Sequence, residues 1–214
     1  MKSFFSVSFR RGGLGFLCLA AILAAGLTGC APSPESSSST ASPSDHREVT
    51  GTDLEGGFVQ PLRNSGTRGT VLLFVATDCP ISNRYAPTIQ QLFADFSKAS
   101  FRFWLVYPDP DTTADEVRSH RSDFQLPMEA LLDPEQALVR VAGAEVTPEA
   151  AVFDSSGNLL YRGRIDNRFV DFGKERPRPT RNDLREVLAA LEDGRPSPVQ
   201  FTKAVGCYIP PLEQ

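Results

Sequence analysis

A short apolar run that ends in a cysteine and a proline constrains this chain more than any other feature. Residues 71–76 (VLLFVA) are continuously apolar, as is typical of a strand buried on both faces of a sheet. Cys79 and Pro80 follow closely, and apolar residues then recur at helical spacing as far as Phe96. A cysteine at the start of a helix lies beside free backbone N–H groups and the positive end of the helix dipole. Because both stabilise a thiolate, we predict that Cys79 is a reactive thiol.

Two considerations oppose that prediction. Asp78 precedes the cysteine, and a neighbouring carboxylate raises the pKa of a thiol. A cysteine after a buried strand can also be a small hydrophobic core residue with no chemistry of its own. The position at a helix start favours the reactive thiol.

The remaining pattern alternates strands and helices. We expect a second buried strand over residues 101–107, helices over 113–124 and 134–141, a hairpin formed by 150–153 and 159–162, and a last helix that begins at Thr180, with Pro134 in the first turn of the second helix. This order predicts an α/β fold with a central mixed sheet and helices on both faces.

The first thirty residues have the pattern of an export signal. Basic residues precede an apolar stretch over residues 14–27, which is shorter than the about 20 apolar residues that span a bilayer. The stretch ends in Leu27-Thr28-Gly29-Cys30, which resembles the bacterial lipobox. That resemblance implies removal of residues 1–29 and lipidation of Cys30.

The segment after Cys30 separates the lipid from the folded part. Residues 30–46 are rich in serine and proline and have too few large apolar side chains to fold, so we expect a flexible linker. Residues 47–214 then form one domain. We expect the protein in the cell envelope, lipid-anchored and facing the periplasm or the exterior. Ala31 after the lipidated cysteine favours the outer membrane in a Gram-negative cell.

Charge and cysteine content restrict the partners. The formal charge is −4, and cleavage removes three basic residues and no acid, which leaves −7. Nucleic acid is therefore not an expected partner. Cys18 lies in the signal and Cys30 at its end, so Cys79 and Cys207 remain for the domain. They can form a reversible redox pair, a permanent disulfide, or no bond, and a bond requires Cα atoms within about 7 Å.

A resemblance makes the reading more specific. Residues 74–87 (FVATDCPISNRYAP) resemble the thioredoxin active-site segment, with Phe74, Ala76, Cys79 and Pro87 at matching positions. Val146-Thr147-Pro148 resembles the cis-proline loop of the same fold. The stretch from about Asp53 to Ile209 is similar to redoxin-domain proteins of the peroxiredoxin-like and thiol–disulfide oxidoreductase-like group. The resemblance implies a thioredoxin-like fold, Cys79 as nucleophile, and a thiolate supported by Ser82, Thr77, Thr147 and Pro148.

The chain departs from both groups at informative positions. Ser82 stands where thioredoxin has its second cysteine, and a serine cannot resolve a mixed disulfide. Peroxiredoxins have Thr or Ser three residues before the reactive cysteine and Pro seven before, whereas this chain has Ala76 and Leu72. Thr77 or Arg164 could still supply hydrogen bonds to a peroxide.

Three functions therefore stay open. The first is thiol–disulfide exchange through Cys79 with resolution by Cys207, the second is a thiol peroxidase, and the third is a non-catalytic binding or structural domain. The first two predict an enzyme whose partners are protein or small-molecule thiols and disulfides, or peroxides, with the membrane reached through the lipid anchor.

No cofactor or metal is expected. The chain has no nicotinamide, flavin or nucleotide motif. Cys79, Cys207 and a histidine could bind copper, but Ser82 replaces one of the closely spaced cysteines that such sites use. His120 lies among charged residues of a polar helix, and we expect it to face solvent.

Overall fold

The computed structural model describes residues 46–63, 66–99 and 101–212 of the chain. The predicted export signal, Cys30 and all but the last residue of the predicted linker lie outside the described residues. The centre of the fold is a seven-stranded mixed sheet with strand order β2-β1-β5-β4-β3-β7-β8. Its strands are β1 (Gly51–Thr52), β2 (Phe58–Val59), β3 (Gly69–Phe74), β4 (Phe101–Tyr107), β5 (Glu129–Leu132), β7 (Glu149–Asp154) and β8 (Leu159–Gly163). Strands β3, β4 and β5 are parallel, and the others pair antiparallel. The predicted mixed sheet is confirmed.

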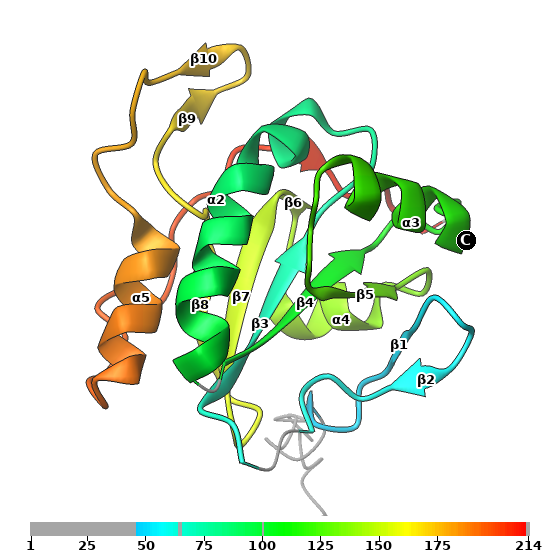
Figure 1. Cartoon of the computed structure of the whole chain (residues 1–214), viewed down its shortest axis with the longest axis horizontal. Coiled ribbons are helices and arrows are strands. Elements are labelled where there is room, and N and C mark those ends of the chain that lie inside the picture. The colour runs from blue at the N-terminus through cyan, green and yellow to red at the C-terminus, as the bar shows by residue number, and fades with distance from the viewer. Residues whose placement is uncertain (1–45, 64–65, 100, 213–214) are drawn as a thin grey trace, which may run out of the picture. The chain divides into compact units, whose positions relative to one another are not determined.

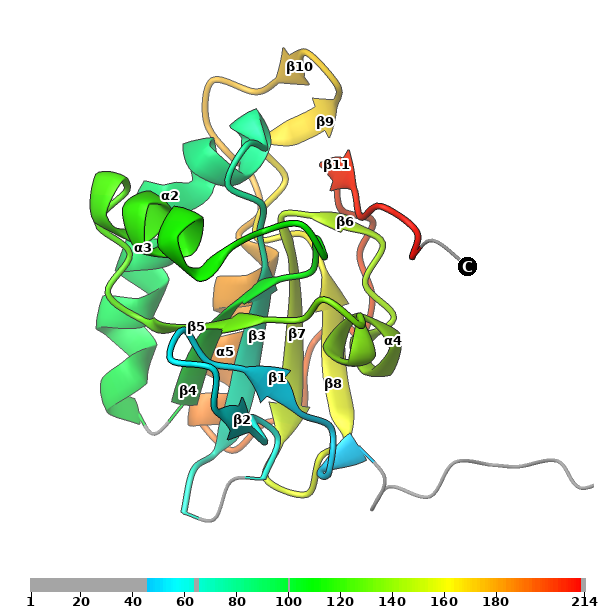
Figure 2. The same ribbon diagram turned by 90° about the vertical axis from the view of Figure 1, so that its right-hand side faces the viewer.

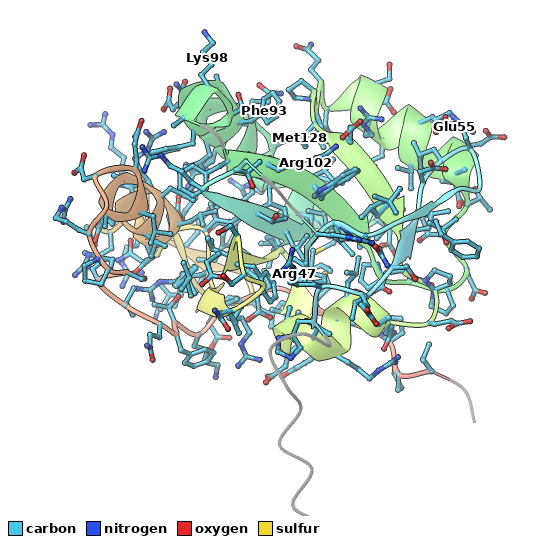
Figure 3. All side chains as sticks on the ribbon, turned by 90° about the horizontal axis from the view of Figure 1, so that it is seen from below. Arg47, Glu55, Phe93, Lys98, Arg102 and Met128 are labelled. Atoms are coloured by element: carbon cyan, nitrogen blue, oxygen red, sulfur yellow. The ribbon has the colours of Figure 1, made fainter. Side chains whose placement is uncertain are left out.

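Helices cover both faces of this sheet. Helices α2 (Pro80–Phe96), α3 (Ala114–Asp123) and α5 (Asp183–Glu192) pack on one face, and the short helix α4 (Ala137–Ala142) packs on the other (Figure 3). Side chains of β3 alternate between the two cores, with Val71 and Leu73 toward α2 and Leu72 and Phe74 toward α4. The 3₁₀ turn η1 (Ser97–Ala99) follows α2. Among the described helices, none is long and apolar enough to cross a membrane.

Helix α2 starts where the sequence predicts. Cys79 is its N-cap with extended backbone angles, and Pro80 occupies the first turn, where its missing N–H costs nothing. The buried face of α2 includes Tyr85, Ile89 and Leu92, spaced four and three residues apart. The strand β3 thus delivers Cys79 to the end of the sheet at the amino-terminal end of α2 (Figure 1).

Two predicted helix starts are wrong. Helix α4 begins at Ala137 and not at Pro134, because Gln136 adopts a left-handed conformation with φ of 54°. The buried carboxylate of Asp133 accepts hydrogen bonds from the backbone N–H groups of Leu138 and Val139, at 3.2 and 3.0 Å, and so caps the helix. Burial raises the pKa of Asp133 to about 6.

Helix α5 begins at Asp183 and not at Thr180. The side chain of Asn167 binds Thr180 twice: its Oδ1 accepts from the Thr180 N–H, and its Nδ2 donates to the Thr180 hydroxyl, each at 2.8 Å. Thr180 therefore belongs to the loop that precedes the helix. A contact thirteen residues away in sequence overrides the local capping pattern.

Two pairs of short strands and the C-terminal tail lie at one end of the sheet. β9 (Phe169–Asp171) and β10 (Lys174–Glu175) form a hairpin, and β6 (Val146–Thr147) pairs with β11 (Cys207–Tyr208). Before it reaches β11, the C-terminal tail follows the edge of β8. There the Arg162 N–H donates to the carbonyl of Gln200 at 2.9 Å, and the Thr202 N–H donates to the carbonyl of Arg162 at 3.1 Å. Figure 2 shows β11 beside β6 and the β9–β10 hairpin projecting beyond that end of the sheet. The tail thereby carries Cys207 to the end of β3.

Candidate thiol site

The structure brings Cys79 and Cys207 together. Their sulfur atoms lie 2.7 Å apart, although 128 residues separate them in sequence, and both cysteines are free thiols. This distance exceeds the about 2.05 Å of a disulfide bond. The Cys79 thiol also donates to the carbonyl of Thr147 at 3.1 Å, and the Thr147–Pro148 peptide is cis. The predicted cysteine loop, proline loop and late cysteine therefore form one site, in which Cys79 is only 2 % exposed.

A glycine allows the tail to approach so closely. In the pairing of β11 with β6, Cys207 lies opposite Thr147, and Gly206 precedes it. A Cβ atom at Gly206 would lie 2.1 Å from the Thr147 carbonyl oxygen, a distance that real side chains do not adopt. Only glycine therefore permits this strand to pass the proline loop and present the next residue to Cys79.

The two thiols differ in acidity. Burial alone would raise the pKa of Cys79, but hydrogen bonds from the Cys207 side chain and from the backbone and hydroxyl of Ser82 outweigh it, so the pKa is lowered. Burial raises the pKa of Cys207 to about 12, helped by its hydrogen bond to Cys79 and by the negative charges of Cys79 and Asp78. The Asp78 carboxylate, expected to act on Cys79, contributes here to Cys207. Cys79 is thus the thiol that ionises first.

The family of the chain follows from its central segment. Residues 46–162, more than half of the chain, match the AhpC/TSA family. The chain belongs to the AhpC/TSA family. This redoxin carries Cys79 and Pro148 within the matched segment, whereas Cys207 lies beyond it. No curated protein matches the chain.

Solved structures support a thioredoxin-like fold for this redoxin. An uncharacterized conserved protein from Geobacillus kaustophilus is 21 % identical with a TM-score of 0.67, over 78 % of this chain and 89 % of its own. A hypothetical protein from Sinorhizobium meliloti is 19 % identical with a TM-score of 0.64, over 75 % and 88 %. The dsbF protein of Mycobacterium tuberculosis, solved in mixed oxidized and reduced forms, is 19 % identical with a TM-score of 0.52, over 68 % and 96 %.

The other residues singled out in the redoxin sequence occupy different positions around the sulfurs. Ser82 is buried in the first turn of α2, and its hydroxyl bonds to no other group, so it is free to donate to the Cys79 thiolate and thereby lower the pKa of Cys79. Thr77 takes part through its carbonyl, which accepts from the Asn83 side chain at 3.2 Å. Arg164 is committed elsewhere, since its guanidinium binds the buried carboxylate of Asp183 at 2.7 and 3.2 Å.

His120 is buried, so the prediction that it faces solvent is wrong. It is 6 % exposed and lies between the ring of Phe124 and the hydroxyl of Tyr107. The charged neighbours of His120 in sequence hid a helical stripe: Val117, His120 and Phe124 recur three and four residues apart. That spacing is the signal from which its burial could have been predicted.

A chain of hydrogen bonds connects His120 to the cysteine loop. The Tyr107 hydroxyl donates to Nδ1 of His120, and Nε2–H of His120 donates to Oδ1 of Asn83, each at 2.8 Å. The Asn83 side chain then donates to the carbonyl of Thr77. A neutral imidazole satisfies both partners, and burial lowers the pKa of His120 accordingly. These hydrogen bonds therefore connect the loop from Thr77 to Cys79 with α3 and β4. The sequence did not reveal this network.

A buried carboxylate holds the proline loop from its other side. Glu149 follows Pro148 directly, and its Oε2 accepts hydrogen bonds from the backbone N–H groups of Glu145 and Val146, at 2.8 and 3.4 Å. Arg162 lies 3.6 Å from the same carboxylate. Burial raises the pKa of Glu149. These bonds fix the strand β6 against which the tail pairs.

Across residues 46–63, 66–99 and 101–212, no group of three or more His, Cys, Asp or Glu side chains could hold a metal ion.

Proposed function

We propose that this redoxin is a thiol–disulfide oxidoreductase in which Cys79 attacks and Cys207 resolves. The observation that carries the proposal is the pair of sulfurs 2.7 Å apart, one thiol with a lowered pKa and the other with a raised one. The attacking thiol reacts as the thiolate, and a second thiol with the higher pKa leaves the first attack to its neighbour.

The two thiols supply both electrons that the reduction of one substrate disulfide requires. The Cys79 thiolate attacks a substrate disulfide, forms a bond to one substrate sulfur and releases the other as a thiolate. The charge on Cys79 is then gone, and with it two of the causes that raise the pKa of Cys207. Cys207 passes its proton to the released substrate thiolate and attacks Cys79. The second substrate sulfur leaves as a thiolate and takes up from solvent the proton that Cys79 lost when it ionised, and the redoxin ends as a Cys79–Cys207 disulfide, oxidised by two electrons.

The same steps in reverse oxidise a substrate dithiol. Turnover as a reductant requires a second dithiol that reduces the Cys79–Cys207 disulfide, and turnover as an oxidant requires a disulfide that restores it. In either direction Ser82 supports the Cys79 thiolate, and Cys207 supplies the second sulfur that the motif itself lacks.

The contacts of Cys79 favour disulfide exchange over peroxide reduction. In the described part of the chain, neither the Thr77 hydroxyl nor the Arg164 guanidinium hydrogen-bonds to Cys79, and Arg164 is paired with Asp183. A cation beside the sulfur, which Arg164 does not provide while it is paired with Asp183, would stabilise the charge that develops on a breaking O–O bond.

An anchored location completes the proposal. We propose that Cys30 carries a lipid and places the domain in the cell envelope, on the strength of Leu27-Thr28-Gly29-Cys30 and the linker that follows. The partners would then be thiols and disulfides of envelope proteins or of small molecules.

Trapping experiments test the proposed roles. In a Cys18→Ser/Cys30→Ser background, reduced protein is treated with an aromatic disulfide, dithiobis(nitrobenzoate). We expect release of two aromatic thiols per chain and a Cys79–Cys207 disulfide by peptide mapping. Cys207→Ser should release one and keep the other on Cys79, while Cys79→Ser should react much more slowly. Absence of the trapped adduct at Cys79 in Cys207→Ser would overturn the assignment.

The Cys207→Ser variant also distinguishes disulfide exchange from the alternative function, peroxide reduction. Stoichiometric hydrogen peroxide and a sulfenic-acid probe are added to Cys207→Ser. We expect slow labelling of Cys79 beside rapid disulfide exchange. Labelling of Cys79 that outpaces exchange would favour a thiol peroxidase, because peroxide first converts the thiolate to a sulfenic acid.

A further inference from the structure

The side chain of Arg162 contacts both segments that meet at Cys79. Arg162 lies near the end of β8, at the edge of the sheet that the C-terminal tail follows. Its guanidinium stacks on the ring of Phe201 in the tail, with the guanidinium carbon 4.7 Å from the ring centroid. Its Nε lies 3.6 Å from a carboxylate oxygen of Glu149, which directly follows Pro148. One guanidinium therefore joins the tail to the proline loop.

The guanidinium is fixed on its proline-loop side. The side chain of Arg162 is 20 % exposed and that of Glu149 only 4 %, and charges partly removed from water are screened less than surface charges. Nη1 of Arg162 lies 3.6 Å from the carboxylate of Glu145 as well. Because Glu149 also accepts hydrogen bonds from the backbone N–H groups of Glu145 and Val146, the cation keeps a set position relative to β6, the strand that pairs with β11.

The tail that Arg162 contacts lies over Cys79. Cys79 is buried, the Cys207 sulfur is 2.7 Å from its own, and Val205 and Cys207 of the tail pack against the apolar cluster that contains Cys79. A substrate sulfur must touch the Cys79 sulfur in the first attack, so the tail has to yield before that step. After the attack the tail has to return, because Cys207 must reach the same sulfur. The position of the tail therefore acts in opposite directions on the two steps.

We propose that Arg162 is a positioning residue that holds the tail over Cys79, so that it slows the first attack and speeds the resolution by Cys207. This role rests on the proposed function, since it concerns the two steps of that exchange. Arg162 acts through other groups: through Phe201 on the tail and through Glu149 on the proline loop. A planar guanidinium suits this place because it stacks on a ring and pairs with carboxylates at the same time.

Arg162→Met tests the guanidinium, since it keeps an apolar stem and the backbone hydrogen bonds that residue 162 makes to the tail. The background is the full chain with Cys18→Ser and Cys30→Ser. Alkylation of Cys79 by iodoacetamide is measured at a pH where this thiol is fully ionised, so that a change in its pKa does not enter. We expect this rate to rise about three- to tenfold, the effect of losing one stacked cation.

Resolution is measured on the same variant with dithiobis(nitrobenzoate). Release of the first aromatic thiol reports the attack by Cys79, and release of the second reports the resolution by Cys207. In Arg162→Met the first release should become faster, and the second should become about three- to tenfold slower, because the loosened tail returns less often to its place over Cys79.

Two further variants keep the role testable if Arg162→Met folds poorly. Arg162→Lys keeps a positive charge beside Glu149 but lacks the planar group that stacks on Phe201, so both rates should lie between those of Arg162→Met and the unaltered chain. Phe201→Leu removes the ring from the tail and leaves the ion pairs of Arg162 in place. It should shift both rates in the same directions as Arg162→Met.

Arg102 offers a matched control. Its guanidinium carbon lies 5.0 Å from the ring centroid of Trp104, and its Nη2 lies 3.5 Å from the carboxylate of Glu129. Because β3 and β4 are parallel, its place near the start of β4 is at the opposite end of the sheet from Cys79 (Figure 3 labels Arg102). Arg102→Met should leave attack and resolution unchanged.

The signs of the two changes decide the outcome. Unchanged rates in Arg162→Met, changes of attack and resolution in the same direction, or equal effects of Arg162→Met and Arg102→Met would overturn the role of Arg162. A trapped adduct at Cys79 in Cys207→Ser, together with normal resolution in Arg162→Met, would remove this role and leave the proposed function standing. Without a trapped adduct the thiol chemistry would fall, whereas faster alkylation of Cys79 in Arg162→Met would still support a tail held by Arg162.

Discussion

His120 donates a hydrogen bond from Nε2 to the side-chain oxygen of Asn83 at 2.8 Å, and through it supports the reactive loop. Asn83 lies one turn into α2 and donates from its amide nitrogen to the carbonyl of Thr77, at the start of the loop that ends at Cys79. Helix α2, whose N-cap is Cys79, is thereby hydrogen-bonded to α3. In this chain of hydrogen bonds, no α3 residue bonds to the Cys79 sulfur itself.

A matched pair of substitutions tests this support. His120→Gln keeps an amide N–H where Nε2 lies, whereas His120→Leu removes both polar atoms and leaves Asn83 and Tyr107 without their partner. We expect His120→Leu to slow alkylation of Cys79 about three- to tenfold, the value of one hydrogen bond, and to lower the free energy of unfolding by about 1–3 kcal/mol. His120→Gln should recover most of the alkylation rate. If both variants lose stability but neither changes the rate, the network only stabilises the fold.

The buried imidazole also predicts a pH dependence of stability. Burial lowers the pKa of His120 in the folded state, so the unfolded state takes up the proton first as the pH falls. Stability from this group is complete above the unfolded value of about 6.5 and declines as the pH drops from there toward the folded pKa. Urea unfolding at several pH values should show this decline in the unaltered chain and a smaller one in His120→Gln. Parallel curves would contradict it.

Alkylation rates should distinguish the two thiols. In a Cys18→Ser/Cys30→Ser background, Cys79 should titrate below the ordinary thiol value of about 8.5, and Cys207 well above it. Ser82→Ala and Cys207→Ala should each move the Cys79 profile to higher pH, because each removes a hydrogen bond to the thiolate. Peptide mass spectrometry after pulses of iodoacetamide measures both sites. A Cys79 rate that rises only above the ordinary value would contradict the lowered pKa.

A single methyl group should separate Cys207 from Cys79. Gly206→Ala places a Cβ against the Thr147 carbonyl, so β11 must leave β6. We expect the mixed disulfide on Cys79 to persist as it does in Cys207→Ser, with nearly unchanged stability of the sheet, since the displaced strand has two residues. Gly173→Ala is the control for backbone strain alone, because its φ of +67° disfavours alanine while a Cβ there has no atom within 4 Å. Normal resolution in Gly206→Ala would show that the tail reaches Cys79 in another way.

Membrane fractionation tests the anchor. Cys30→Ala should move the protein from the membrane to the soluble fraction and stop incorporation of labelled palmitate, because no thiol is left to carry the lipid. Cys18→Ala, which changes the other cysteine of the predicted export signal, should leave both the membrane association and the palmitate incorporation unchanged. Membrane association that survives Cys30→Ala would contradict lipidation at this residue.

The local parts of the fold followed from the sequence because they depend on neighbours in the chain. A run of apolar residues before Cys79, then Pro80 and a helical apolar stripe, determines strand, turn and helix within 30 residues. The alternation of such units implied helices on both faces of a mixed sheet. The first residues of α4 and α5 were less predictable. Side-chain hydrogen bonds of Asp133 and Asn167 set where these helices begin, and local sequence patterns do not contain those bonds.

The thiol pair and its support were decided by tertiary structure. Cys79 and Cys207 meet only because the tail follows the edge of β8 and pairs with β6, and sequence spacing carries no record of that path. His120 is buried because α3 turns one face toward β4 and α2, while its charged neighbours point to solvent. The sequence by itself determined which residue could be a thiolate, because Cys79, Pro80 and the apolar stripe that define the start of α2 are adjacent in the chain. Only the fold decided which groups surround it, because hydrogen bonds and burial depend on distances between segments that are far apart in the chain.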